Sequence, residues 1–192
     1  MLFRSQASPD VYRPSSLLSH PNGHTLVLSG TPDYGYTGGG LLFFDRNTRT
    51  SKVLKHTDLL MYHSVKSLTA VPGNSELLVG GTTTEPGTGG ATIATEAELF
   101  VFNMTSLKII WHQAVFSGVQ AYTELYSMPS SGLVIGFADK SRFFVFDPST
   151  RKVIYNKTVG SVSSQQGPRV FVPDPRDSTG NTVFVSHSWS IS

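Results

Sequence analysis

The chain has 192 residues, of which 39% are hydrophobic, and it contains 18 glycines. This length and composition suit one ordinary folded domain and exclude a chain that is disordered throughout. The net charge is only +2 and the basic residues are scattered, so a nucleic-acid-binding surface is not expected. The absence of cysteine excludes disulfides, a thiolate nucleophile and a Cys-ligated metal.

The apolar runs are short, as in LLFF at 41–44, so no membrane-spanning segment and no membrane partner are expected. The first ten residues, MLFRSQASPD, lack the apolar run of roughly 7–15 residues that a signal peptide needs. The compartment is therefore unknown, and secretion is expected only if the true N-terminus lies upstream of Met1.

Taken in chain order, three segments repeat the same succession of elements. The first covers residues 16–54 and reads SLLSHPNGHTLVLSG, then a loop, then GGLLFFDRNTRTSKVL. The second, residues 67–111, reads SLTAVPGNSELLVGG, then a longer loop, then AELFVFNMTSLKIIW. The third, residues 123–155, is the unbroken run TELYSMPSSGLVIGFADKSRFFVFDPSTRKVIY. Each unit predicts four short strands separated by turns.

Residue types explain where the strands end. Proline cannot donate to a strand ladder, and in each unit a proline follows the first predicted strand beside turn-forming residues such as Asn22-Gly23. The runs LLFF, LFVF and FFVF are apolar on both faces, as expected of strands that lie between neighbouring sheets. Asp45 and Asp147 follow two of these runs and are predicted to form turns, because aspartate can bond its own downstream amides.

The two ends of the chain repeat only part of the unit. Residues 168–189 contain two strand candidates, RVFV and TVFVS, around a turn rich in Pro, Asp and Gly. Residues 1–15 offer at most one strand. We therefore expect a partial unit at each end.

Repeated four-stranded units of roughly 40–50 residues are typical of β-propeller blades. Over residues 16–155 the chain resembles the WD40-like propeller superfamily of PQQ-like, YVTN and quinoprotein-type repeats, whose blades combine an LLVG strand with an LFVFD-x-x-T-x-K-V-I-W segment. The expected fold is an all-β propeller in one domain, residues 1–192, with about three complete blades and partial blades at both ends. In one arrangement the ring is completed by further blades, so that the chain is a piece of a larger propeller, for example seven-bladed, or associates with itself. In the other, head and tail share a blade and close a four-bladed ring.

The loops between the second and third strands differ most among the units. TPDYGYTGG at 31–39 and TTTEPGTGGATIATE at 82–96 are insertions, and long loops on one rim of a propeller can build a binding surface. Carboxylates there suit acid–base chemistry, and tyrosines can stack on a sugar ring. The alternative is that these loops are passive surface insertions. The candidate ligand-binding residues are Asp33, Tyr34, Tyr36, Glu85, Glu96, Tyr122 and Glu124.

Neither a metal nor a cofactor is expected. His20 and His24 flank a hairpin turn and should lie in solvent, and no HExxH spacing occurs. His63, His112 and His187 could meet only through the fold, as the metal-binding histidines of propeller lyases acting on acidic sugars do. The GTGG run is read as a flexible turn because the lysine of a phosphate-binding loop is missing. A quinone cofactor is disfavoured because alcohol-oxidising quinoproteins carry an adjacent cysteine pair.

The sequence favours a non-catalytic module whose loop surfaces bind a protein or a glycan. The alternative is a carbohydrate-acting enzyme, a lyase or hydrolase, with its site at the channel mouth. The chain has no GxSxG motif, which would indicate a serine hydrolase, and the catalytic residues are unknown. The strand pattern also predicts that Phe144→Asp abolishes soluble expression, because the charge would lie between sheets.

Overall fold

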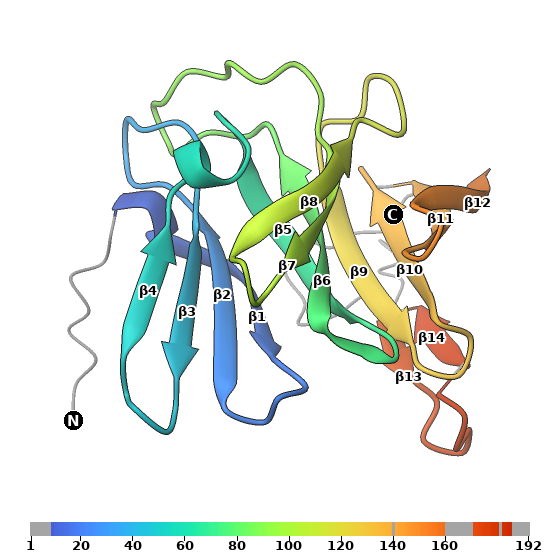
Figure 1. The fold of residues 1–192 in the computed structure, drawn as a ribbon. Coiled ribbons are helices and arrows are strands. Elements are labelled where there is room, and N and C mark those ends of the chain that lie inside the picture. The colour runs from blue at the N-terminus through green and yellow to red at the C-terminus, as the bar shows by residue number, and fades with distance from the viewer. Residues whose placement is uncertain (1–8, 140, 160–170, 181, 186–192) are drawn as a thin grey trace, which may run out of the picture.

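The computed structural model describes residues 9–139, 141–159, 171–180 and 182–185. Three four-stranded antiparallel sheets and one two-stranded hairpin follow one another along the chain (Figure 1). Helix in this part of the chain is limited to two 3-10 turns, η1 (Pro9–Val11) and η2 (His56–Asp58). The expected all-β class is confirmed, and so is the prediction that each complete repeat forms four strands.

Each sheet consists of strands in sequence order. The stretch RFFVFDPSTRKVIY forms the third and fourth strands of the third sheet, as predicted. The bounds are, for the first sheet, β1 (Arg13–Ser19), β2 (Thr25–Thr31), β3 (Leu41–Asp45) and β4 (Ser51–Leu54); for the second, β5 (Ser64–Val71), β6 (Asn74–Thr83), β7 (Leu99–Asn103) and β8 (Lys108–Gln113); for the third, β9 (Tyr122–Met128), β10 (Leu133–Ala138), β11 (Arg142–Asp147) and β12 (Lys152–Thr158); and for the hairpin, β13 (Phe171–Pro173) and β14 (Val183–Val185).

The sheets pack with their first strands together. β5 contacts β1 and β2 of the first sheet and β9 of the third. The fourth strands β8 and β12 are mostly exposed, and β4 begins exposed and ends buried. The first strands therefore lie next to one another, although β1 itself is mostly exposed, and the fourth strands lie at the periphery.

The β13–β14 hairpin packs on the face of the third sheet that is turned away from the second. Phe171 is 1% exposed and stacks on Phe137, with 5.2 Å between the ring centroids. Within the described residues, the pairing of β13 with β14 confirms that both strand candidates of the tail form strands. These residues contain no closed ring of sheets, so the number of blades stays a prediction.

The second sheet is covered on both faces. The LFVF run of β7 is entirely buried, with Phe100 and Phe102 contributing to the core against the first sheet and Val101 to the core against the third. In the first sheet, Leu41 and Phe43 are buried whereas the alternate side chains of LLFF are only half-buried. The expectation of burial on both faces is therefore confirmed for β7 and corrected for β3.

Glycine within the second strand makes room for an aromatic ring. Gly80 pairs with Phe100 across β6 and β7, and Gly136 pairs with Phe144 across β10 and β11. A Cβ atom at Gly80 would lie 2.0 Å from the Cζ atom of Phe100. The repeated glycine is thus a packing requirement of the second and third sheets.

The predicted turn-forming roles of the aspartates are confirmed. The Asp147 carboxylate accepts hydrogen bonds from the backbone and hydroxyl groups of Ser149 and Thr150, and the Asp45 carboxylate accepts from the amides of Asn47 and Thr48. The hydroxyls of Ser149 and Thr150 are the main reason that the pKa of Asp147 lies below its usual value.

Candidate binding surface

The long connections at one end of the sheets form a continuous layer, at the top of Figure 1. Successive strands alternate in direction, so the connections after every second strand lie at the same end. We call these segments the loop layer: residues 32–40, 55–63, 84–98 and 114–121.

The two insertion loops are hydrogen-bonded to each other. The Gly35 amide donates to the Thr88 carbonyl at 2.9 Å, and the Gly87 amide donates to the Tyr36 carbonyl at 3.0 Å. A Cβ atom at Gly87 would lie 2.2 Å from the carbonyl oxygen of Asp33. The glycines of GTGG therefore permit a close approach between loops, which corrects the interpretation of this run as a flexible turn.

The other segments of the loop layer join through Glu96 and His63. Nε2 of His63 lies 2.9 Å from the Glu96 carbonyl oxygen, and the Gly39 amide donates to the His63 carbonyl at 3.0 Å. The Glu96 carboxylate accepts hydrogen bonds from the Gly118 amide at 2.7 Å and the Ser117 hydroxyl at 3.0 Å. Glu96, predicted as a ligand-binding residue, thus connects two loops.

Four of the predicted site residues lie in the paired insertion loops. Tyr34 and Tyr36 are 69% and 57% exposed, and Glu85 is also exposed. Asp33 is half-buried, and its carboxylate accepts a hydrogen bond from the Tyr34 amide at 2.6 Å. The structure therefore brings these four residues together on one surface.

Tyr122 and Glu124 lie elsewhere, on β9. Tyr122 is 0% exposed and packs edge-on against Phe144, so it belongs to the core and cannot serve as a surface platform. Burial raises the pKa of its hydroxyl. Glu124 is half-buried and is paired with Phe137 of β10. The expectation that Tyr122 belongs to the ligand-binding surface is corrected by its complete burial.

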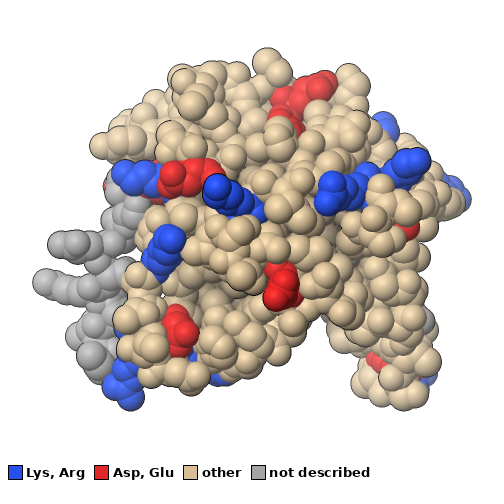
Figure 2. Space-filling model, in the orientation of Figure 1, with Lys and Arg blue, Asp and Glu red and all other residues tan. Residues whose placement is uncertain are grey.

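The loop layer also exposes apolar side chains that sequence reasoning missed. Met61 is 56% exposed, Ile93 is 48% exposed and Tyr62 is 38% exposed. These residues lie in connections between strands, where an apolar side chain has no sheet face to cover. Apolar residues inside predicted loops were therefore the sequence signal that could have identified them. A patch of acidic side chains lies at the top of the molecule in the view of Figure 2. The loop layer contains one basic residue, Lys55, and the acidic residues Asp33, Asp58, Glu85, Glu96 and Glu98. The surface is therefore acidic, with several exposed apolar groups.

The candidate metal-binding histidines do not meet in the described residues. His112 pairs with Glu98, with 2.5 Å between Nδ1 and Oε2, whereas His63 bonds to backbone carbonyls. His187 lies outside the described residues. Within them, no three acidic or histidine side chains are grouped to hold a metal ion.

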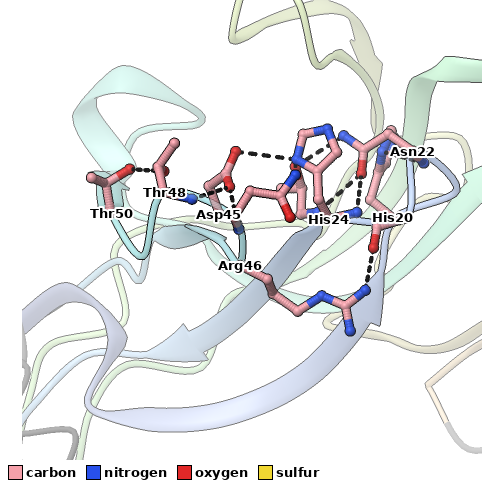
Figure 3. A network of polar contacts seen from close by, with 10 residues as sticks. His20, Asn22, His24, Asp45, Arg46, Thr48 and Thr50 are labelled. Carbon is pink, nitrogen blue, oxygen red and sulfur yellow. Dashed lines mark hydrogen bonds and ion pairs between the residues drawn. The ribbon is translucent and has the colours of Figure 1, made fainter.

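A pocket of about 400 Å³ lies at the opposite end of the sheets, between the first and the second. One wall carries a polar network around the β1–β2 turn, in which the Asp45 carboxylate lies 3.1 Å from Nδ1 of His24 (Figure 3). In the same network the Arg46 guanidinium donates to the Gly23 carbonyl. His20 also lines the pocket and is only 3% exposed, so the prediction that it lies in solvent is wrong. The His20 side chain therefore lies between the first and second sheets, where Ser75 and Glu76 of β6 line the same pocket.

No protein-family model matches the chain, and no curated protein matches its sequence. In the described part of the chain, no helix is both long and apolar enough to cross a membrane. The geometry of the two surfaces is therefore the basis for inferring function.

Replacing Glu96 by alanine should loosen the loop layer. The change removes the acceptor for the Gly118 amide and the Ser117 hydroxyl, and each such bond contributes about 1 kcal/mol. We expect faster hydrogen exchange in residues 114–121 and a lower midpoint of denaturant unfolding. Glu85→Ala is the matched control, because Glu85 is exposed in the same loop. Equal exchange rates in both variants would contradict the connecting role of Glu96.

Proposed function

We propose that this protein is a non-catalytic β-propeller module that presents its loop layer to a partner protein or glycan. The observation that carries the proposal is the group of exposed apolar side chains, Tyr34, Tyr36, Met61 and Ile93, on loops that are hydrogen-bonded together. Exposed apolar groups on an ordered surface are typical of interaction sites, and tyrosine is enriched at the centre of interfaces.

The order of the strands supports the propeller assignment. In a propeller, each four-stranded blade places one terminal strand near the central axis and the other at the rim. Here β5 packs against β1 and β9, while β8 and β12 are exposed. We infer that the three sheets are consecutive blades and that the β13–β14 hairpin begins a fourth.

The use of the carboxylates favours binding over catalysis. Glu96 accepts hydrogen bonds that join two loops, and Glu98 pairs with His112. A glycosidase needs a pair of carboxylates facing one another across the substrate. Asp33 and Glu85 are the acidic side chains of the predicted set that remain at the insertion loops, and Asp33 bonds the backbone of Tyr34.

Binding can be tested with a printed glycan array and a phage-displayed peptide library, each probed with the purified chain. We expect a ligand whose affinity falls at least about tenfold in the double variant Tyr34→Ser/Tyr36→Ser, because truncating a hot-spot tyrosine typically removes 1 kcal/mol or more. Tyr155→Ser is the control, since Tyr155 is 50% exposed on β12.

Two results would count against the proposal. A ligand that binds the wild type and the double variant equally would place binding away from the tyrosines. Release of products from a polysaccharide panel, abolished by Glu85→Gln, would instead favour the carbohydrate-acting enzyme.

A further inference from the structure

The first repeat departs from the other two at one buried position. The residue before the turn proline is Val71 in the second unit and Met128 in the third, but it is His20 in the first. Because this position is buried, with His20 only 3% exposed, an apolar residue would suit it better than a histidine. The architecture of the sheet therefore does not require a histidine there.

A second polar replacement lies in the same sheet and lines the same pocket. Lys52 is paired with Phe43 of β3, two residues before the turn aspartate of the first unit. At the corresponding place in the second sheet, Trp111 is paired with Val101, and it stacks on Phe146 of the third sheet with 5.4 Å between the ring centroids. The tryptophan fills the interface between the second and third sheets.

The interface between the first and second sheets is hollow at this end. Both His20 and Lys52 line the pocket of about 400 Å³, together with Phe43 at its apolar side. Small-molecule sites typically measure roughly 300–1,000 Å³. The pocket is thus large enough for a ligand and is lined by the two polar replacements.

The His20 ring carries a buried hydrogen-bond donor in the wall of this pocket. The backbone amide of Asn22 donates a hydrogen bond to Nδ1 of His20 at 3.3 Å. The neutral ring therefore carries its hydrogen on Nε2. Nε2 is buried and has no hydrogen-bond partner of acceptable geometry among the described residues. Burial lowers the pKa of His20, while the neighbouring Asn22 side chain and Ser75 backbone oppose this shift. A buried donor of this kind calls for an acceptor.

The remaining walls select against a charged ligand. The carboxylates of Asp45 and Glu76 oppose an anion, and the ammonium group of Lys52 opposes a cation. Asp45 already bonds His24 and its own turn. Besides the buried Nε2 of His20, the pocket offers Lys52 as a donor, Glu76 as an acceptor, and the hydroxyl groups of Ser51, Ser75 and Thr105. A polyhydroxy molecule matches such a mixture, because each hydroxyl both donates and accepts.

We propose that this pocket binds a small uncharged polyhydroxy molecule of the size of a single sugar ring. The site lies at the end of the sheets opposite the loop layer, and it does not depend on the function proposed above. Ligand oxygens would accept from Nε2 of His20 and from Lys52, and a ligand hydroxyl would donate to Glu76.

The test uses ligand-observed NMR with methyl glucoside, methyl galactoside, methyl mannoside and myo-inositol, and with inorganic phosphate as the charged probe. We expect saturation transfer from the protein to at least one of the uncharged probes. The same titration should shift the imidazole 15N resonance of His20 Nε2, as measured in a 1H–15N long-range spectrum. The affinity for phosphate should be weaker.

Two variants copy the residues found elsewhere in this chain. Lys52→Trp introduces the side chain that fills the neighbouring interface, and His20→Met introduces the residue of the third unit. Each should fold and weaken binding at least about tenfold. Lys157→Trp, on the exposed part of β12, is the control and should bind as the wild type does. If His20→Met does not fold, Lys52→Trp alone decides, because Lys52 is exposed. Unchanged sugar binding by folded Lys52→Trp, absence of binding by every uncharged probe, or a preference for phosphate would each overturn the proposal.

Discussion

Phe144→Asp is expected to prevent the protein from accumulating in folded, soluble form. Phe144 is 0% exposed between the second and third sheets, and its ring lies 5.7 Å from that of Tyr122 and 5.8 Å from that of Phe116. Removing a buried phenylalanine side chain costs about 3–5 kcal/mol, and an unpaired carboxylate adds to this loss. Since domains are stable by only about 5–15 kcal/mol, most or all of the stability would be lost.

Ile154→Asp is the matched control for this change. Ile154 lies on β12 of the same sheet and is 56% exposed. Substitutions at such surface positions usually change the free energy of unfolding by about 0.5 kcal/mol or less. Soluble yield and near-UV circular dichroism of the two variants give the comparison. A folded Phe144→Asp protein would contradict the packing of the second sheet on the third.

Gly80→Ala should destabilise the protein although it adds only one methyl group. The new Cβ atom would lie 2.0 Å from Cζ of Phe100 and 2.4 Å from Cε1, so the buried ring must move. Overpacking of this kind costs about 1–3 kcal/mol. Urea denaturation at constant slope measures the loss directly.

A double-mutant cycle identifies the cause of that loss. Phe100→Leu alone should destabilise the protein by opening space, but combined with Gly80→Ala it should remove the clash. We expect the two changes together to cost less than the sum of the single changes. Strict additivity would show that the ring over Gly80 is not the reason for the glycine.

The strands and turns were predictable because their signals are local. Proline after the first strand, aspartate after the third and short apolar runs between them each act within a few residues. Gly23, Gly73 and Gly132 have positive φ angles of 80°, 72° and 72°, as their turns require. The repetition of these signals made the four-stranded units visible without any knowledge of their packing.

The candidate sites were less predictable because they depend on contacts between units. Tyr122 follows a loop in the sequence, yet it begins β9 and is covered by Phe116 from the preceding connection. His20 looked exposed because it adjoins a turn, but it is buried at the pocket between the first and second sheets, while the turn itself is exposed. The contact of Gly87 with Asp33 joins two loops of different units, and spacing along the chain does not reveal it.

The position of the second sheet, covered on both faces, has a consequence for how the molecule comes apart. In arrays of stacked units, stability is approximately the sum of each unit and its contacts with its neighbours. A substitution in the exposed strand β12 should disturb few contacts between sheets. A substitution in β7 should weaken the contacts of the second sheet with both of its neighbours. Loss of the second sheet should therefore destabilise both the first and the third sheet, because it packs against both of them.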